Sequence, residues 1–179
     1  MRKEIRIAGF GGQGIGLSGY ILGKALALYE GLNAVMTQSY GPEARGGASS
    51  ASIVLSDRDI AYPFVERPDC LIVLSQEAYN KFQASLKPEG LLIIDSDLVA
   101  PANNTKLVSI RATHIAEGLG ARIAANMVIL GFFSKQSEIV RLDSLNRAVE
   151  TTVPSKFIDL NLNAAAAGYE YAAVGESIP

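Results

Sequence analysis

Apolar and polar residues recur along the chain with two periods, one typical of strands and one typical of helices. Short apolar runs rich in β-branched residues alternate with longer stretches in which apolar residues return every three or four positions. The short runs predict six strands, at 4–8, 34–38, 50–55, 70–74, 91–94 and 106–110. The longer stretches predict helices at 14–29, 76–86, 121–133, 137–151 and 154–173, with Ser137 as an N-cap.

This order of strands and helices is the one expected for a mostly parallel sheet covered by helices. We therefore expect an α/β, Rossmann-like three-layer sandwich, with helices on both faces of the sheet and a helical C-terminal third. The chain has 179 residues, 49% of them hydrophobic, which is enough for one domain with a substantial core. We expect residues 1–179 to form that single domain.

Charge and composition argue against nucleic acid and membranes as partners of the chain. The net charge of -2 and the aromatic content of 7% provide no basic surface for phosphate backbones, so nucleic acid is not an expected partner. The N-terminus enters a strand pattern without a signal-peptide segment, and no apolar run approaches the roughly 18 residues of a membrane span. We expect a cytoplasmic protein that does not contact a membrane.

Cys70 is the only cysteine of the chain. One thiol excludes an internal disulfide, and it cannot supply the several thiolates that an iron–sulfur cluster needs. Its apolar neighbours, Leu71 to Leu74, predict a buried position in a strand. Electrons, if the protein handles them, must pass through other chains.

A glycine-rich loop follows the first predicted strand and opens the first predicted helix. Its sequence, GFGGQG, satisfies the GxGxxG pattern through Gly9, Gly11 and Gly14, and also contains Gly12 and Gln13. Glycines permit positive φ and a close backbone approach to an anion, which the first N–H groups of the helix attract. These residues are candidates to bind phosphate or carboxylate. The alternative is that the glycines serve only a tight turn.

Dinucleotide binding would require a further residue. In NAD-binding folds of this kind an Asp or Glu at the end of the second strand, about twenty residues beyond the loop, holds the ribose hydroxyls. That place holds Thr37, Gln38, Ser39 and Tyr40. The sequence therefore contains the glycine half of the NAD-binding motif but not its acidic half.

A second glycine-rich loop, SYGPEARGG, separates the second and third predicted strands. At the end of a parallel strand it would lie beside the first loop, where open α/β sheets usually bind ligands. Its candidate binding residues combine a planar fork of donors, an aromatic ring and glycines that leave room for a ligand: Arg45, Tyr40, Gly41, Gly46 and Gly47. The alternatives are a rigid turn in which Arg45 pairs with Glu43, and a contact between subunits.

A few other polar residues could bind or react, but each has a simpler structural role. His114, the only histidine, has no nucleophile or acid arranged with it in the sequence. Asp95 and Asp97 end a predicted strand, where acids can hold a ribose or a metal but also cap helices. Glu77 lies where a helix dipole alone favours an acid. We assign no catalytic residue and no metal ligand to the chain.

The two glycine loops in this order resemble those of the gamma subunits of 2-oxoacid:ferredoxin oxidoreductases. The resemblance extends through Tyr62-Pro63, Pro68-Asp69 and the run LSQEA at 74–78, and it covers nearly the whole chain. The form YGPEARGG is similar to the 2-oxoglutarate and branched-chain (2-ketoisovalerate) members rather than to the pyruvate members.

This resemblance implies a part in the oxidative decarboxylation of a 2-oxoacid with coenzyme A, which yields acyl-CoA, carbon dioxide and reduced ferredoxin. It implies alpha and beta subunits as partners, and a ferredoxin-like delta subunit where one is present, with thiamine diphosphate, magnesium and the iron–sulfur clusters on those partners. The chain would be inactive alone, help assembly and contact coenzyme A. The sequence leaves open two alternatives, a free-standing nucleotide-binding enzyme and a pure interaction module, and an isolated chain could form a homodimer.

Overall fold

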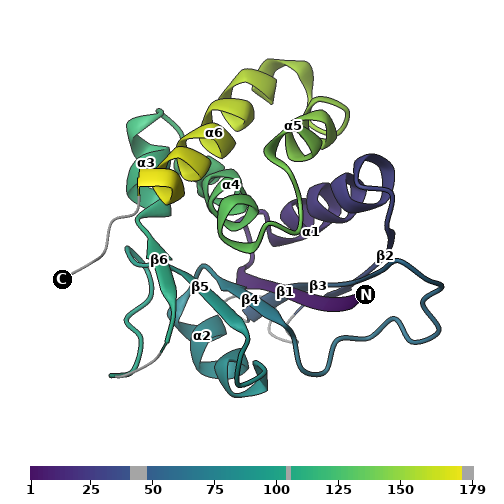
Figure 1. Cartoon of the computed structure of the whole chain (residues 1–179). Helices are drawn as coiled ribbons and strands as arrows, with labels where there is room; N and C mark the ends of the chain where they lie inside the picture. The colour runs from purple at the N-terminus through teal and green to yellow at the C-terminus, as the bar shows by residue number, and fades with distance from the viewer. Residues whose placement is uncertain (41–47, 104–105, 175–179) are drawn as a thin grey trace.

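A six-stranded sheet with helices on both faces forms the centre of the protein (Figure 1). The computed structural model describes residues 1–40, 48–103 and 106–174. The strands are β1 (Arg2–Phe10), β2 (Asn33–Ser39), β3 (Ala48–Ser56), β4 (Cys70–Val73), β5 (Leu91–Asp95) and β6 (Val108–Ile110), in the spatial order β2-β3-β1-β4-β5-β6. All six predicted strands are present, and the α/β prediction is confirmed.

One strand runs against the other five. β1 pairs in parallel with β4, β4 with β5 and β5 with β6. β3 lies between β1 and β2 and pairs antiparallel with both. β1 and β2 therefore run in the same direction, so their carboxyl ends lie at the same edge of the sheet.

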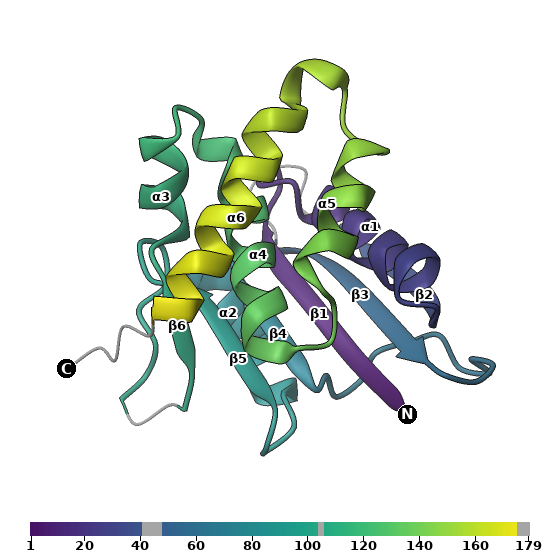
Figure 2. The same cartoon turned by 45° about the horizontal axis from the view of Figure 1, so that its top comes forward.

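The helices cover the two faces unequally. One face carries α1 (Ile15–Lys24), α3 (Ala112–Gly118), α4 (Ala125–Ser137), α5 (Leu142–Glu150) and α6 (Ile158–Val174), whereas α2 (Gln76–Phe82) lies on the other (Figures 1 and 2). Short turns of other helix types adjoin them, a π turn at Ala25–Tyr29 and 3-10 turns at Gln83–Ser85, Arg122–Ala124 and Ser155–Phe157. The helical C-terminal third is confirmed. Among the described residues no helix is both long and apolar enough to span a membrane.

Alternate residues of the strands enter two hydrophobic cores. In β4, Cys70 and Ile72 face the larger helical layer, whereas Leu71 and Val73 pack against α2. Cys70 is 5% exposed, as its place in an apolar run predicts. Burial raises the pKa of its thiol to about 11, so the sulfur stays protonated at neutral pH.

The backbones of α4 and α6 touch where the two helices cross over the sheet (Figure 2). Gly131 of α4 faces the carbonyl group of Ala165, and Gly168 of α6 faces that of Val128. A β-carbon at either glycine would overlap the facing oxygen atom. α6 therefore approaches α4 more closely than any side chain at these positions would allow.

Two features of the helical region differ from the prediction. Ser137 ends α4 instead of capping the next helix, because Glu138 adopts a left-handed conformation with φ of 54° and α5 begins only at Leu142. The N-cap prediction for Ser137 is therefore wrong. The predicted helices also omit α3, a helix of 7 residues between β6 and α4.

Candidate functional site

The first glycine loop lies at the carboxyl edge of the sheet, between β1 and α1. Gly12 and Gly14 have φ values of 93° and 72°, a left-handed conformation that residues with a side chain rarely adopt. A β-carbon at Gly11 or Gly12 would have no atom of the described residues within 4 Å. The backbone at these two glycines therefore faces open space and is accessible to a ligand.

Two other glycines of the loop are needed for packing. A β-carbon at Gly9 would overlap the Gln13 side chain and come within 2.9 Å of Ile15 Cδ1. At Gly14 it would overlap the amide of Asn126, whose Nδ2 atom lies 3.4 Å from the Gly14 carbonyl oxygen. One motif thus combines close packing at Gly9 and Gly14 with an open backbone at Gly11 and Gly12.

The Gln13 side chain holds the loop in place. Its Oε1 atom accepts a hydrogen bond from the Phe10 backbone N–H at 2.6 Å. Its Nε2 atom donates to the carbonyl oxygen of Leu74, directly after β4, at 2.7 Å. Gln13 therefore joins the ends of two strands, a structural role beside the binding role that the sequence suggests.

The N-terminus of α1 has no side-chain cap. Gly14 occupies the N-cap position, and the first turn contains no acidic residue. The first N–H groups of a helix have no partner within it, and the helix dipole adds partial positive charge at this end. An anion above the loop would satisfy these donors.

A cavity of about 200 Å³ opens beside the loop, and its lining includes Gly12, Gln13, Leu74, Thr113, Arg122 and Ile123. Arg122 brings a cation to this cavity. Its side chain is 65% exposed and lies 3.7 Å from Glu117. Such an exposed ion pair is weak, so the guanidinium is free to turn toward an anion in the cavity. Arg122 could not be recognised from the sequence, because it is far from the loop in the chain and belongs to no motif.

The carboxylates of Asp95 and Asp97 accept hydrogen bonds from residues at the start of α3. The Asp95 Oδ2 atom accepts hydrogen bonds from Thr113 Oγ1 at 2.6 Å and from the Thr113 N–H at 3.1 Å. Asp97 accepts from Arg111 Nε at 2.9 Å and from the His114 N–H at 2.7 Å. Burial raises the pKa of Asp95, and the hydrogen bonds from Thr113 oppose the rise. Both acids therefore anchor the start of α3, the capping role that the sequence allowed.

Glu77 also has a structural role, at the N-terminus of a helix. It lies in the first turn of α2, whose N-cap Ser75 accepts a hydrogen bond from the Ala78 N–H at 3.2 Å. Over residues 1–40, 48–103 and 106–174, no three His, Cys, Asp or Glu side chains gather in an arrangement that could hold a metal ion.

The second glycine loop lies mainly outside the described residues, and with it Gly41, Arg45, Gly46 and Gly47. Tyr40 is described and is 73% exposed. The strand register pairs Phe10 with Ala48 and Ser39 with Ser50. The two loops therefore begin at the same edge of the sheet, about one strand apart, as expected. Their binding roles stay predictions.

Residues 4–171 match the family model for pyruvate ferredoxin/flavodoxin oxidoreductase. The chain belongs to this family. A relative within it, the 2-oxoglutarate synthase subunit KorC of Methanocaldococcus jannaschii, is 47% identical over 96% of this chain and 95% of its own length. The family resemblance inferred from the sequence is thereby confirmed.

Other members of the oxidoreductase family agree with this assignment. The solved gamma subunit of a keto/oxoacid ferredoxin oxidoreductase from Geobacter sulfurreducens has a TM-score of 0.87 at 38% identity, with 97% of this chain and 98% of that one covered. The ketoisovalerate oxidoreductase subunit VorA of Methanothermobacter thermautotrophicus is 35% identical over 94% of this chain but only 36% of VorA. In VorA the matching region is therefore one part of a longer chain.

Proposed function

We propose that this chain is the gamma subunit of a 2-oxoacid:ferredoxin oxidoreductase that acts on 2-oxoglutarate. The observation that carries the proposal is the 47% identity to a 2-oxoglutarate synthase subunit, 95% of which is covered. A branched-chain substrate has weaker support, because identity to the ketoisovalerate subunit is 35%. Residues 1–179 would act as one gamma-type domain within a cytoplasmic enzyme.

The partner subunits would carry the redox chemistry. Thiamine diphosphate with magnesium and the iron–sulfur clusters would be bound by those partners, as the family resemblance implies. The single cysteine of this chain is buried in β4 and cannot hold a cluster. Alpha and beta subunits, with a ferredoxin-like delta subunit where present, would decarboxylate the 2-oxoacid and pass its electrons to ferredoxin.

This chain would contribute part of the coenzyme A site. The open backbone at Gly11 and Gly12, the uncapped N-terminus of α1 and the guanidinium of Arg122 all offer hydrogen-bond donors to a phosphate group. The second loop leaves the same edge of the sheet, so Tyr40 and Arg45 would contact the same ligand or a partner subunit there. No described residue is assigned to a chemical step.

Purification of the tagged chain from its native cells, under anaerobic conditions, tests the subunit assignment. We expect thiamine diphosphate and iron–sulfur subunits to co-purify, with dye reduction that requires both 2-oxoglutarate and coenzyme A. A chain that emerges alone and binds NAD(P) would be the free-standing nucleotide-binding enzyme. The absence of an acid at Ser39 and Tyr40, where β2 ends, argues against that enzyme.

The variant Arg45→Ala in the reconstituted complex separates ligand contact from subunit contact. A higher KM for coenzyme A with intact assembly supports the ligand contact. Failed assembly supports the pure interaction module at this loop. If neither the KM for coenzyme A nor the assembly changes, Arg45 contacts neither the ligand nor a partner subunit.

A further inference from the structure

A second cavity, of about 330 Å³, lies on the face of the sheet opposite α1. We call it the sheet recess; its lining includes Arg6, Ser39, Ser50, Ser52, Lys81 and Phe82. In β3, Ala51 and Ile53 belong to the core beneath α1, so the alternate serines face the other way. We propose that the sheet recess binds a small organic anion, through Arg6 and Lys81 as cations and the serine hydroxyls as donors.

Arg6 provides a half-buried guanidinium whose hydrogen bonds all go to neutral oxygens. Nε donates to Ser52 Oγ at 3.3 Å, Nη1 to Ser85 Oγ at 3.2 Å and Nη2 to the Val65 carbonyl oxygen at 2.5 Å. Over the described residues, no carboxylate lies within ion-pair distance of Arg6. Burial lowers the pKa of this guanidinium, and the more distant charge of Glu4 opposes the change. A desolvated cation without a counter-ion costs free energy, which a bound anion would offset.

Lys81 adds a second positive charge to the sheet recess. Its ammonium lies 5.3 Å from the centroid of the Phe82 ring, and the Arg6 guanidinium lies 5.0 Å from the same centroid. Lys81 also has no ion-pair partner in the part of the chain that the structure describes. Among the residues that the structure describes, no acidic side chain lines the recess. Two neighbouring cations without an acid are complementary to an anion.

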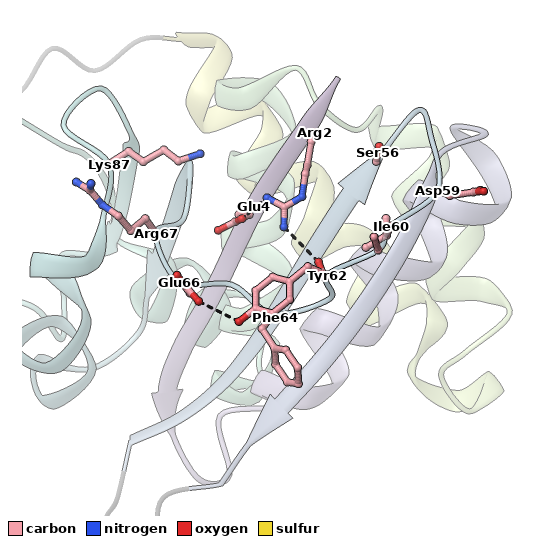
Figure 3. Close-up of a pocket in the computed structure, with 11 residues that line it drawn as sticks. Arg2, Glu4, Ser56, Asp59, Ile60, Tyr62, Phe64, Glu66, Arg67 and Lys87 are labelled. Atoms are coloured by element: carbon pink, nitrogen blue, oxygen red, sulfur yellow. Dashed lines mark hydrogen bonds and ion pairs between the residues drawn. The ribbon is translucent and has the colours of Figure 1, made fainter.

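A neighbouring cavity, of about 520 Å³, differs from the sheet recess in the charges that line it (Figure 3). There Arg2 is paired with Glu4, and Glu66 accepts a hydrogen bond from the Tyr62 hydroxyl at 2.9 Å. Acidic residues (Glu4, Asp59 and Glu66) and basic residues (Arg2, Arg67 and Lys87) therefore line this cavity together, whereas the described residues that line the sheet recess include basic residues but no acidic ones. Phe64 lines both cavities and is 55% exposed.

Size and lining indicate the class of ligand. A volume of about 330 Å³ is at the lower end of the range for small-molecule sites. Arg6 presents a planar fork suited to phosphate or carboxylate, and the rings of Phe64 and Phe82 offer apolar surface. The ligand is therefore a metabolite-sized anion with a phosphate or carboxylate group and an apolar portion. The glycine-loop cavity is a separate site, because it lies on the side of α4.

Two-dimensional NMR of the full-length chain tests the proposal, with inorganic phosphate and succinate as probes at constant ionic strength. We expect saturable shifts of the Arg6 Nε–H signal and of the Ser50 and Ser52 amides. Saturation by phosphate alone assigns a phosphorylated ligand, and saturation by succinate alone assigns a carboxylate. Failure of both probes to saturate these signals overturns the proposal. The Gly11 and Gly12 amides report the glycine loop separately, so the two sites can fail independently.

Two variants and a matched control show whether the recess itself binds the anion. Lys81→Gln should weaken binding about two- to fivefold, as loss of one exposed charge does. Arg6→Lys, which keeps the charge but loses the fork, should weaken it about tenfold or more. The control is Lys135→Gln in α4, since Lys135 lies over the Tyr169 ring at 5.4 Å on the other side of the sheet. Equal weakening by Lys81→Gln and Lys135→Gln would mean general charge attraction and would overturn the site.

Lys81 is exposed, so its substitution should not disturb folding, and the comparison with Lys135→Gln holds even if Arg6→Lys impairs folding.

Discussion

Gln13 fastens the first glycine loop to the end of β4, because its Nε2 atom donates to the Leu74 carbonyl oxygen at 2.7 Å. The same side chain accepts a hydrogen bond from the Phe10 N–H at 2.6 Å. The conformation of the loop therefore depends on one amide side chain as well as on glycine.

Gln13→Ala removes both of these hydrogen bonds and leaves the Phe10 N–H and the Leu74 carbonyl without them. We expect the free energy of unfolding to fall by about 1–3 kcal/mol, measured by urea titration. The assembled enzyme should also show a higher KM for coenzyme A. Gln136→Ala, at an exposed position of α4, is the control and should change neither quantity. A Gln13→Ala protein of unchanged stability would contradict the bracing role.

Gly131→Ala tests the direct contact between α4 and α6. Its β-carbon would overlap the Ala165 carbonyl, so the helices must separate, and we expect a loss of about 1–3 kcal/mol in thermal or chemical unfolding. Gly23→Ala in α1 is the matched control, because a β-carbon there meets no atom within 4 Å in the part of the chain that the structure describes. Alanine favours helix over glycine, so the control should gain up to about 1 kcal/mol. Equal responses of the two variants would show that the crossing tolerates a side chain.

Cys70 should make stability depend on pH in the alkaline range. Burial raises the pKa of the thiol from its ordinary value near 9 to about 11, so the folded chain holds a proton that the unfolded chain loses first. Stability is then fully present below about pH 9 and declines as pH rises toward about 11, by on the order of 2 kcal/mol. The measurement is the difference between the parent and Cys70→Ala across this range, which subtracts the other ionising groups. A constant difference would contradict the shift.

Arg122→Gln tests the cation beside the first glycine loop. In the reconstituted enzyme we expect the KM for coenzyme A to rise about tenfold, because a charged hydrogen bond to phosphate is lost, with kcat little changed. Arg58→Gln is the control, since Arg58 is exposed in the loop after β3, away from the carboxyl edge of β1. If both variants behave alike, Arg122 has no specific contact with the ligand.

Local patterns explain what could be predicted from the sequence. Each strand was recognisable because its apolar run is short and bounded by turn residues, and the first loop because GxGxxG lies at a strand-to-helix junction. The reversed direction of β3 was not recognisable, because strand pairing depends on residues far apart in the chain. The sequence also does not show that Ser50 and Ser52 line a recess, because the other residues of its lining lie far from them in the chain.

The residues of the candidate site also divide into those that local sequence patterns predict and those that only the tertiary fold brings together. Gly9, Gly12 and Gly14 could be predicted because each has a local backbone or packing requirement. Arg122 could not, because only the tertiary fold brings the start of α4 beside the loop. Ser137 was misread because α4 continues through it and ends only at Glu138, whose left-handed conformation is not indicated by the local sequence.

The glycine contact between α4 and α6 also bears on biosynthesis. α6 is the last described helix to leave the ribosome, and until it does, the surface of α4 around Gly131 lacks its cover. The nascent chain would therefore expose an apolar surface until residues 158–174 have emerged, and during that interval it is open to chaperones and to aggregation. Stalling before residue 158 should leave α4 without the cover of α6.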